Sequence, residues 1–227
     1  MTCHQVSRSM GCRTHPAAPV FRGPGWWRRA SADERAPRPN GRLSWWASRV
    51  TWPAVSRFEE YDPQVHGVED ASVVVRHAGS DDAAAIAWVD ATREPRLPSH
   101  LDWVVAQLAR GDAIHVVAEC HGQVVGASAV KVWPEHADAP AGWYVSGITV
   151  MPSWRRRRVG DRMLALELAG VDRLHEPTWS VVNARNGASL DLHARHGFVE
   201  VARAAAFAGI TFTGGTGLLL HRAARTP

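Results

Sequence analysis

The sequence has little of what marks secreted, membrane-spanning or disulfide-stabilised proteins. Its 227 residues include only three cysteines, Cys3, Cys12 and Cys120, too few and too widely spaced for a disulfide framework or a zinc site. No apolar run reaches about 18 residues, so we expect no transmembrane helix. Arg8 and Arg13 lie near the start, but no continuous apolar stretch follows them, which argues against a secretory signal. The expectation is a cytoplasmic protein without a membrane partner.

Charge is distributed unevenly, although the chain as a whole carries only +4. Residues 1–57 hold ten arginines against Asp33 and Glu34, whereas residues 58–227 have more acidic than basic residues. The high isoelectric point therefore belongs to the first quarter of the chain. In the remainder, basic residues are concentrated at 155–158.

Residues 1–70 differ in composition from the rest. They are rich in proline, arginine and tryptophan, and no helical or strand period persists in them. Such a composition rarely offsets the entropy lost on ordering, so we expect a disordered extension. Its tryptophans and arginines could stack on single-stranded nucleic acid or lie on a membrane surface. Because no repeat or motif organises them, a leader without function is the preferred interpretation, and a nucleic-acid partner is not expected.

Residues 71–224 have the alternating periods of one α/β domain. Short β-branched runs predict strands, and apolar residues three and four apart predict helices, with Pro and Gly between them. The stretch from His121 to Gln123 separates two strand-like runs and indicates a hairpin. Strands are predicted at 72–78, 113–120, 124–133, 142–151, 178–183, 199–207 and 216–223, and helices at 81–91, 100–110, 160–174 and 187–198.

Four consecutive arginines, Arg155 to Arg158, lie between the strand that ends near Val150 and the helix that begins near Gly160. A helix N-terminus presents unpaired N–H groups and a positive dipole end, which suits an anion such as pyrophosphate. Arginines in the loop would add bidentate phosphate contacts. A nucleic-acid patch would spread over a face, and the rest of the domain is net acidic, so a local anion site is the better interpretation.

The stretches ITVMPSWRRRRVGDRML and NARNGASLDLHARHGF resemble two motifs of the GNAT acyltransferases, which bind acetyl-CoA. The first, ITVMPSWRRRRVGDRML, is similar to the strand–loop–helix of that family and its loop motif Q/R-x-x-G-x-G/A. Arg155, Arg158 and Gly160 occupy the motif positions. The loop follows a strand and opens a helix, as the family pattern requires.

The second stretch, NARNGASLDLHARHGF, is similar to the later family segment N-x-x-A-x-x-L-Y-x-x-x-G-F. Position 189 is Ser where Ala is usual, and position 193 is His where Tyr is usual. The resemblance covers about residues 72–222, with both motifs in the expected order and at the expected separation. The residues that match are Asn186, Leu192, Gly197 and Phe198.

The resemblance implies a mixed α/β fold with a mostly antiparallel sheet flanked by helices on both faces. It also implies acyl-CoA-dependent N-acyl transfer, from acetyl-CoA as co-substrate to a primary amine, which we expect to belong to a small molecule. By resemblance His193 protonates the leaving thiolate. No metal is expected, because His193 and His196 have a spacing that could hold one but no third ligand is evident. The residues expected at the cofactor are Ile148, Thr149, Val150, Arg155, Arg156, Arg157, Arg158, Val159, Gly160, Asp161 and Asn186.

Two positions depart from the family pattern. Arg158 stands where the first loop glycine is usual, and positive φ there would cost a non-glycine residue roughly 1–2 kcal/mol. An extra phosphate contact could offset that cost; otherwise the loop bends differently and CoA binds weakly or not at all. His193 replaces tyrosine, and imidazole can also donate a proton near neutrality. The alternative for His193 is an exposed helix histidine.

Gly147 interrupts a good strand, which is typical of a bulge or of close backbone approach. The family carries such a distortion in its fourth strand, so Ile148 and Val150 would pair with the pantetheine arm by resemblance. The general base is harder to assign: Glu119 is the first candidate and His115 the second, although either side chain could face solvent. Acidic residues that could bind a polyamine-like acceptor, or simply be solvated, are Asp90, Glu94, Asp102, Glu135 and Asp138.

Two other functions stay open. The scaffold could have lost catalysis, with Arg158 as the visible cause, and serve as a CoA-binding or protein-interaction module. Alternatively, residues 1–57 could bind nucleic acid. The sequence does not identify the acceptor, and it leaves open whether the chain forms a homodimer.

Overall fold

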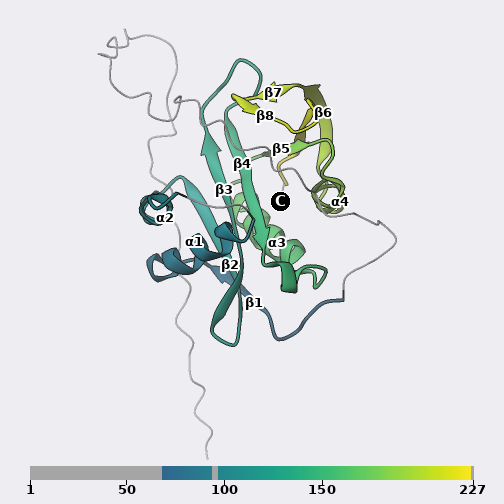
Figure 1. Cartoon of the computed structure of the whole chain (residues 1–227). Coiled ribbons are helices and arrows are strands. Elements are labelled where there is room, and N and C mark those ends of the chain that lie inside the picture. The colour runs from purple at the N-terminus through teal and green to yellow at the C-terminus, as the bar shows by residue number, and fades with distance from the viewer. Residues whose placement is uncertain (1–67, 94–96, 226–227) are drawn as a thin grey trace, which may run out of the picture. The chain divides into compact units, whose positions relative to one another are not determined.

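The computed structural model describes residues 68–93 and 97–225, so most of the predicted extension lies outside the described residues. The elements follow the predicted order with one added hairpin (Figure 1). The helices are α1 (Ala83–Ala91), α2 (His100–Leu108), α3 (Val159–Asp172) and α4 (Gly187–Arg195). The strands are β1 (Val74–His77), β2 (Ala113–Cys120), β3 (Gln123–Trp133), β4 (Gly142–Val150), β5 (Thr178–Asn183), β6 (Val199–Ala204), β7 (Ala206–Phe207), β8 (Ile210–Thr211) and β9 (Gly217–Arg222).

One seven-stranded sheet organises the domain, in the order β1-β2-β3-β4-β5-β9-β6. Every neighbouring pair is antiparallel except β4 and β5, which are parallel. The hairpin of β2 and β3 turns at His121 and Gly122, whose φ values of 49° and 79° are those of a type I′ turn. The predicted mixed, mostly antiparallel sheet and its hairpin are therefore confirmed.

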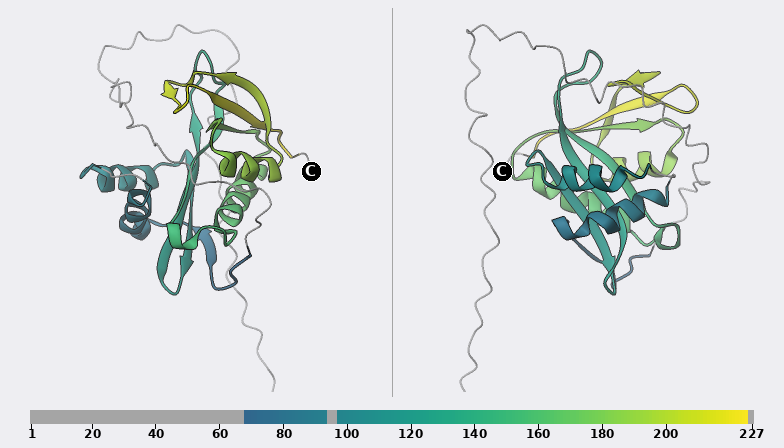
Figure 2. Two further views of the ribbon diagram at one scale, coloured as in Figure 1. Left: turned by 45° about the vertical axis from the view of Figure 1, so that its right-hand side comes forward. Right: turned by 60° about the vertical axis from the view of Figure 1, so that its left-hand side comes forward.

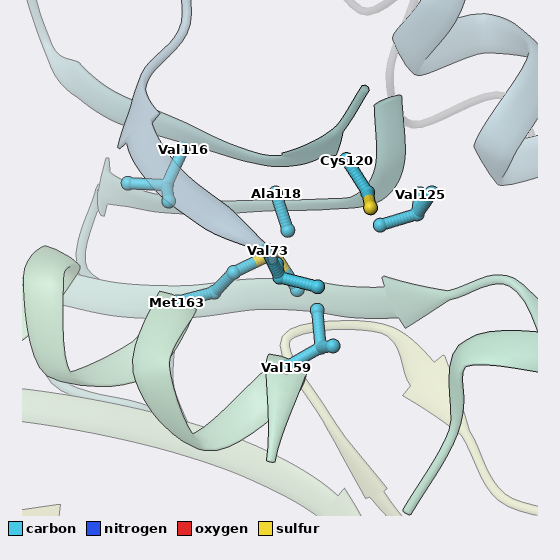
Figure 3. Packing of buried hydrophobic residues seen from close by; sticks show 7 residues of the cluster. All are labelled: Val73, Val116, Ala118, Cys120, Val125, Val159 and Met163. Carbon is cyan, nitrogen blue, oxygen red and sulfur yellow. The ribbon is translucent and has the colours of Figure 1, made fainter. Parts of the chain in front are cut away.

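Helices cover both faces of the sheet: α1 and α2 lie on one face, and α3 and α4 on the other (Figure 2). Successive side chains of a strand point to opposite faces of the sheet, so β2 packs against the helices on both faces. Val116 and Ala118 belong to the cluster that includes Met163 of α3, whereas Val117 packs with α1. Figure 3 shows the first cluster, in which Val73 also packs beneath α3.

The buried stripe of α3 fixes the helix on the sheet. Met163, Leu164, Leu168 and Val171 repeat at helical spacing and are at most 3% exposed. Burying such a side chain contributes about 1.5–3 kcal/mol. The loop that precedes α3 is therefore held firmly at the end of β4.

The end of the domain differs from the prediction. One strand was expected over 199–207, but β6 ends at Ala204, and β7 pairs with β8 in a separate two-stranded sheet. Ala208 and Gly209 make the turn, with φ values of 49° and 77°. Alanine is not a usual residue for a left-handed turn position, which is why the sequence did not indicate this hairpin.

Candidate functional site

The loop between β4 and α3 contains left-handed backbone at two arginines. It begins with the 3-10 turn Pro152–Trp154, after which Arg156 has φ 60°. Arg158, the N-cap residue of α3, has φ 56° and ψ 15°. Arginine thus adopts the conformation that glycine takes most easily, and the loop keeps its turn without glycine.

The arginine side chains of this loop differ in what they contact. Arg155 Nε donates a hydrogen bond to the Val150 carbonyl at 3.2 Å. Arg157 Nη1 donates to Asp70 Oδ2 at 2.9 Å. Arg158 is exposed, and within the described part of the chain its side chain makes no hydrogen bond or ion pair. Its guanidinium is therefore the one most readily offered to a ligand.

The first turn of α3 adds backbone donors to these side chains. Because the Arg162 N–H bonds the Arg158 carbonyl at 3.1 Å, the N–H groups of the preceding helical residues find no acceptor inside the helix. A Cβ placed on Gly160 would lie 3.4 Å from Ile148 and 3.8 Å from Leu192. These are ordinary van der Waals distances, so a small side chain such as that of alanine would also fit between β4 and α4.

The middle of β4 is distorted where the sequence predicted a bulge. Gly147 has φ 116°, and the register with β3 shifts between Ser128 and Val130. On its other side β4 pairs with β5 only through Trp143–Val145. Among the described residues, no strand continues that ladder beside Ile148–Val150. The backbone there can pair with an extended ligand.

Helix α4 forms the other wall of this region and begins with a side-chain cap. Asn186 Oδ1 accepts a hydrogen bond from the Ser189 N–H at 3.1 Å, which explains why this position suits asparagine. Asp161, in the first turn of α3, forms an ion pair with Arg195 of α4 at 3.3 Å, and its Oδ1 lies 3.3 Å from Nε2 of His196, the C-cap residue of α4. These contacts hold the two helices together on the same side of the sheet.

His193 is buried, with 2% of its surface exposed, so the alternative of an exposed helix histidine is wrong. Its Nδ1 lies 2.7 Å from the Ser189 carbonyl, which can only accept, so Nδ1 carries the proton. Nε2 is buried and has no partner among the described residues. Burial lowers the pKa of His193, the nearby His196 adds to that effect, and the Ser189 hydrogen bond opposes it. At neutral pH the imidazole therefore presents a bare Nε2 that can accept a proton.

The structure does not bring Glu119 to this region. Glu119 lies where β2 pairs with β1, and its Oε2 accepts hydrogen bonds from Arg76 at 2.8 and 3.1 Å. Arg76 also holds Asp82, so the carboxylate belongs to an ion-paired group at that sheet edge. His115 is separated from β4 by β3, and desolvation lowers its pKa to about 4.

The acidic residues considered for an acceptor site are also separated. Asp90 Oδ2 lies 3.0 Å from His100 Nε2 at the α1–α2 junction. Asp138 Oδ1 accepts a hydrogen bond from the Ala208 N–H in the β7–β8 turn. Both carboxylates thus have structural partners, and Asp102 and Glu135 are exposed. Glu94 lies outside the described residues.

One buried titratable group was missed by the sequence reasoning. Glu167 lies in the apolar stripe of α3, fully buried, and Oε1 accepts a hydrogen bond from Ser128 Oγ at 2.6 Å. Desolvation raises the pKa of Glu167 to about 8, although the Ser128 hydrogen bond opposes the shift. Its position one helical turn from Leu164 could have indicated burial, but a glutamate at such a position is usually solvated.

Two kinds of site were not found in residues 68–93 and 97–225. No helix there is both long and apolar enough to span a membrane. No group of at least three His, Cys, Asp or Glu side chains there is arranged to hold a metal ion.

Comparison with known proteins shows to which family the chain belongs. Residues 80–198 match the sequence model of the acetyltransferase (GNAT) family, whose co-substrate is acetyl-CoA. No curated protein matches the chain.

Solved structures with the same fold come from several bacteria. A GNAT acetyltransferase of Streptococcus pneumoniae is 16% identical (TM-score 0.53), with 67% of this chain and 99% of that one covered. The ribosomal-protein-S18-alanine N-acetyltransferase of Escherichia coli is 14% identical (0.55; 68% and 96%). A Salmonella typhimurium protein named as an acetyltransferase and solved with acetyl-CoA is 19% identical (0.55; 69% and 96%).

The sequence match spans the bulged β4, the arginine loop and α4. The chain therefore belongs to the GNAT family of acetyltransferases.

Proposed function

We propose that this protein transfers the acetyl group of acetyl-CoA to a primary amine of a small molecule. One observation carries the proposal: β4 loses its β5 partner after Val145, and the arginine loop and the N-terminus of α3 follow directly. An extended pantetheine arm suits the unpaired strand, and a pyrophosphate suits the free N–H groups of the helix.

The proposed binding roles follow from these positions. Ile148, Thr149 and Val150 offer backbone groups to the pantetheine arm. Arg155–Arg158 with Val159, Gly160 and Asp161 form the pyrophosphate loop. Asp161 contributes through its N–H, since its carboxylate is paired with Arg195. Asn186 supports the site by capping α4. The ladder with β3 is interrupted at the Gly147 bulge, and we assign a backbone N–H there to stabilise the charge that develops on the acetyl oxygen.

Acetyl-CoA supplies an acetyl group activated as a thioester. In the transfer the amine nitrogen bonds to the acetyl carbon and the carbon–sulfur bond breaks, with its electron pair left on sulfur. One proton must leave the nitrogen and one must reach the sulfur. The nitrogen bonds to the same carbon that the sulfur leaves, so one side chain can reach both atoms. We assign both proton transfers to Nε2 of His193, which starts unprotonated and can accept before it donates.

The β7–β8 hairpin favours a small acceptor over a polypeptide. Phe207 of this hairpin packs with Tyr144 and Leu219, and Tyr144 is fully buried. Asp138 fastens the hairpin through the Ala208 N–H at 2.9 Å. The sheet face opposite α3 is therefore covered next to β4, which leaves less open surface for a protein chain.

Two measurements test the proposal. Isothermal titration should show acetyl-CoA binding, and no binding at millimolar ligand to folded protein would overturn it. Release of free CoA should then be followed with polyamines, aminoglycosides, amino acids and a peptide with an N-terminal alanine. Turnover of the peptide alone would reject the small acceptor. Binding without any turnover would favour a CoA-binding module. His193→Gln should bind acetyl-CoA normally and lose turnover.

A further inference from the structure

Acidic groups just before β1 contact the loop side of α3. Asp70 Oδ2 accepts a hydrogen bond from Arg157 Nη1 at 2.9 Å. Arg162, in the first turn of α3, donates to the Asp70 carbonyl at 3.2 Å and pairs with Glu69 at 3.5 Å. We refer to Glu69–Ser72 as the acidic segment. It joins two parts of the chain that are far apart in sequence.

The carboxylate of Asp70 is fixed rather than loosely tethered. Its Oδ1 accepts hydrogen bonds from the N–H and the Oγ of Ser72, at 3.0 and 2.6 Å. The next residue, Val73, is 1% exposed and anchors the segment in the core beneath α3. The Ser72 and Arg157 contacts lower the pKa of Asp70 to about 2. The carboxylate therefore keeps its negative charge at physiological pH.

Arg157 is held on two sides. Its guanidinium carbon lies 4.8 Å from the centroid of the Trp154 ring, and its Nη1 is bonded to Asp70. It belongs to the loop to which we assign the CoA phosphates. A guanidinium that already bears a carboxylate attracts a second anion less strongly, and two anions on one cation repel each other.

We propose that the acidic segment is an internal competitor for the phosphate-binding loop, in which Asp70 occupies Arg157 until CoA displaces it. The inference rests on the proposed function for the identity of the ligand. Linkage makes the effect reciprocal: Asp70 weakens CoA binding, and bound CoA loosens the acidic segment. Arg157 and Asp70 are both partly exposed, so the expected change is about two- to fivefold in affinity, as for other exposed pairs.

The central experiment measures CoA affinity by isothermal titration for the full chain and for Asp70→Asn. Asparagine can still accept from Ser72, so the turn should survive, and the variant should bind CoA about two to five times more tightly. Glu69→Gln is the matched control. It removes the same charge one residue away but faces Arg162 rather than Arg157, so its gain should be smaller.

A double-mutant cycle separates occupation of Arg157 from general charge. In an Arg157→Ala background, Asp70→Asn should no longer raise the affinity. The inference would be overturned if Asp70→Asn raised CoA affinity equally in the Arg157→Ala background, or if Glu69→Gln raised it as much as Asp70→Asn. Either result would mean that only the loss of negative charge matters. Weaker binding by Asp70→Asn would also overturn it, because Asp70 would then position Arg157 for the ligand.

Hydrogen exchange gives a second readout that does not depend on affinity. Saturating CoA should speed amide exchange in residues 70–73, whereas slower exchange would contradict displacement. If neither protein binds CoA, the proposed function fails, and the comparison passes to inorganic pyrophosphate. Tighter pyrophosphate binding by Asp70→Asn would still support the competitor. Equal or absent binding would remove it.

Discussion

Helix α3 and its N-cap contain two residues that are unusual at their positions, one exposed to solvent and one buried. Arg158 caps the helix in a left-handed conformation, exposed to solvent and without a side-chain partner among the described residues. Glu167 lies nine positions further along the chain, fully buried in the apolar stripe. Its Oε1 is bonded to Ser128, but Oε2 has no partner in the described part of the chain.

Solvent exposure determines how the energetic cost of each residue can be offset. A ligand can reach Arg158, so backbone strain there can be offset by a new contact on binding. No ligand can reach Glu167, so its cost must be offset within the protein, and the single Ser128 hydrogen bond does so only in part. Strain at exposed Arg158 can therefore be offset by a ligand, whereas the cost of burying Glu167 has to be offset within the fold.

The largest predicted effect is the pH dependence that Glu167 imposes on stability. The unfolded state loses its proton near pH 4.5, whereas the folded state keeps it to about pH 8. Between these values the folded state binds more protons, so stability falls as pH rises. Relative to Glu167→Gln, the wild type should lose about 1.4 kcal/mol per pH unit, or about 4–5 kcal/mol in total.

Urea unfolding from pH 5 to 9 measures this difference. Glu176→Gln is the control, because Glu176 is an exposed glutamate just after α3 and should leave the slope unchanged. Parallel pH curves for wild type and Glu167→Gln would show that Glu167 ionises normally. The contrast with Arg158 would then disappear.

Much of the fold and of the loop was predictable because each feature has a local cause. Period-two and helical spacing located the sheet strands and helices, and Gly147 predicted the bulge that the register shift now shows. The arginine loop was predictable from its place between a strand and a helix. Two-residue β7 and β8 were not, because so short a strand has no period and Ala208 takes the turn position.

The remaining features depend on contacts between distant residues, which one sequence does not reveal. Asp70 and Arg157 are separated by 87 positions, and Ser128 and Glu167 by 39. Neither contact was predicted from the sequence. The hydrogen bond between Arg76 and Glu119, the candidate base, was not predicted for the same reason. It depends on the pairing of β1 with β2.

An intermediate effect is expected at Gly147, which sharpens the comparison because it is strained backbone without a side chain. Its φ of 116° is unfavourable for any other residue, although a Cβ there would meet nothing within 4 Å. Gly147→Ala should therefore cost about 1–3 kcal/mol through the backbone alone. Gly111→Ala is the control: it also meets nothing within 4 Å and has no positive φ. Thermal unfolding should separate the two variants, and equal midpoints would mean that β4 tolerates the strain.

The smallest effect on stability should occur at Arg158, where the choice of replacement separates strain from charge. Arg158→Gly relieves the left-handed strain and should stabilise the fold by about 1 kcal/mol, whereas Arg158→Ala keeps that strain. Both variants lose the guanidinium, so both should bind CoA about three to ten times more weakly. Calorimetric titration and urea unfolding of the pair give the two quantities independently. Tighter binding or new turnover in Arg158→Gly would show that the arginine side chain obstructs the loop and does not contribute a phosphate contact.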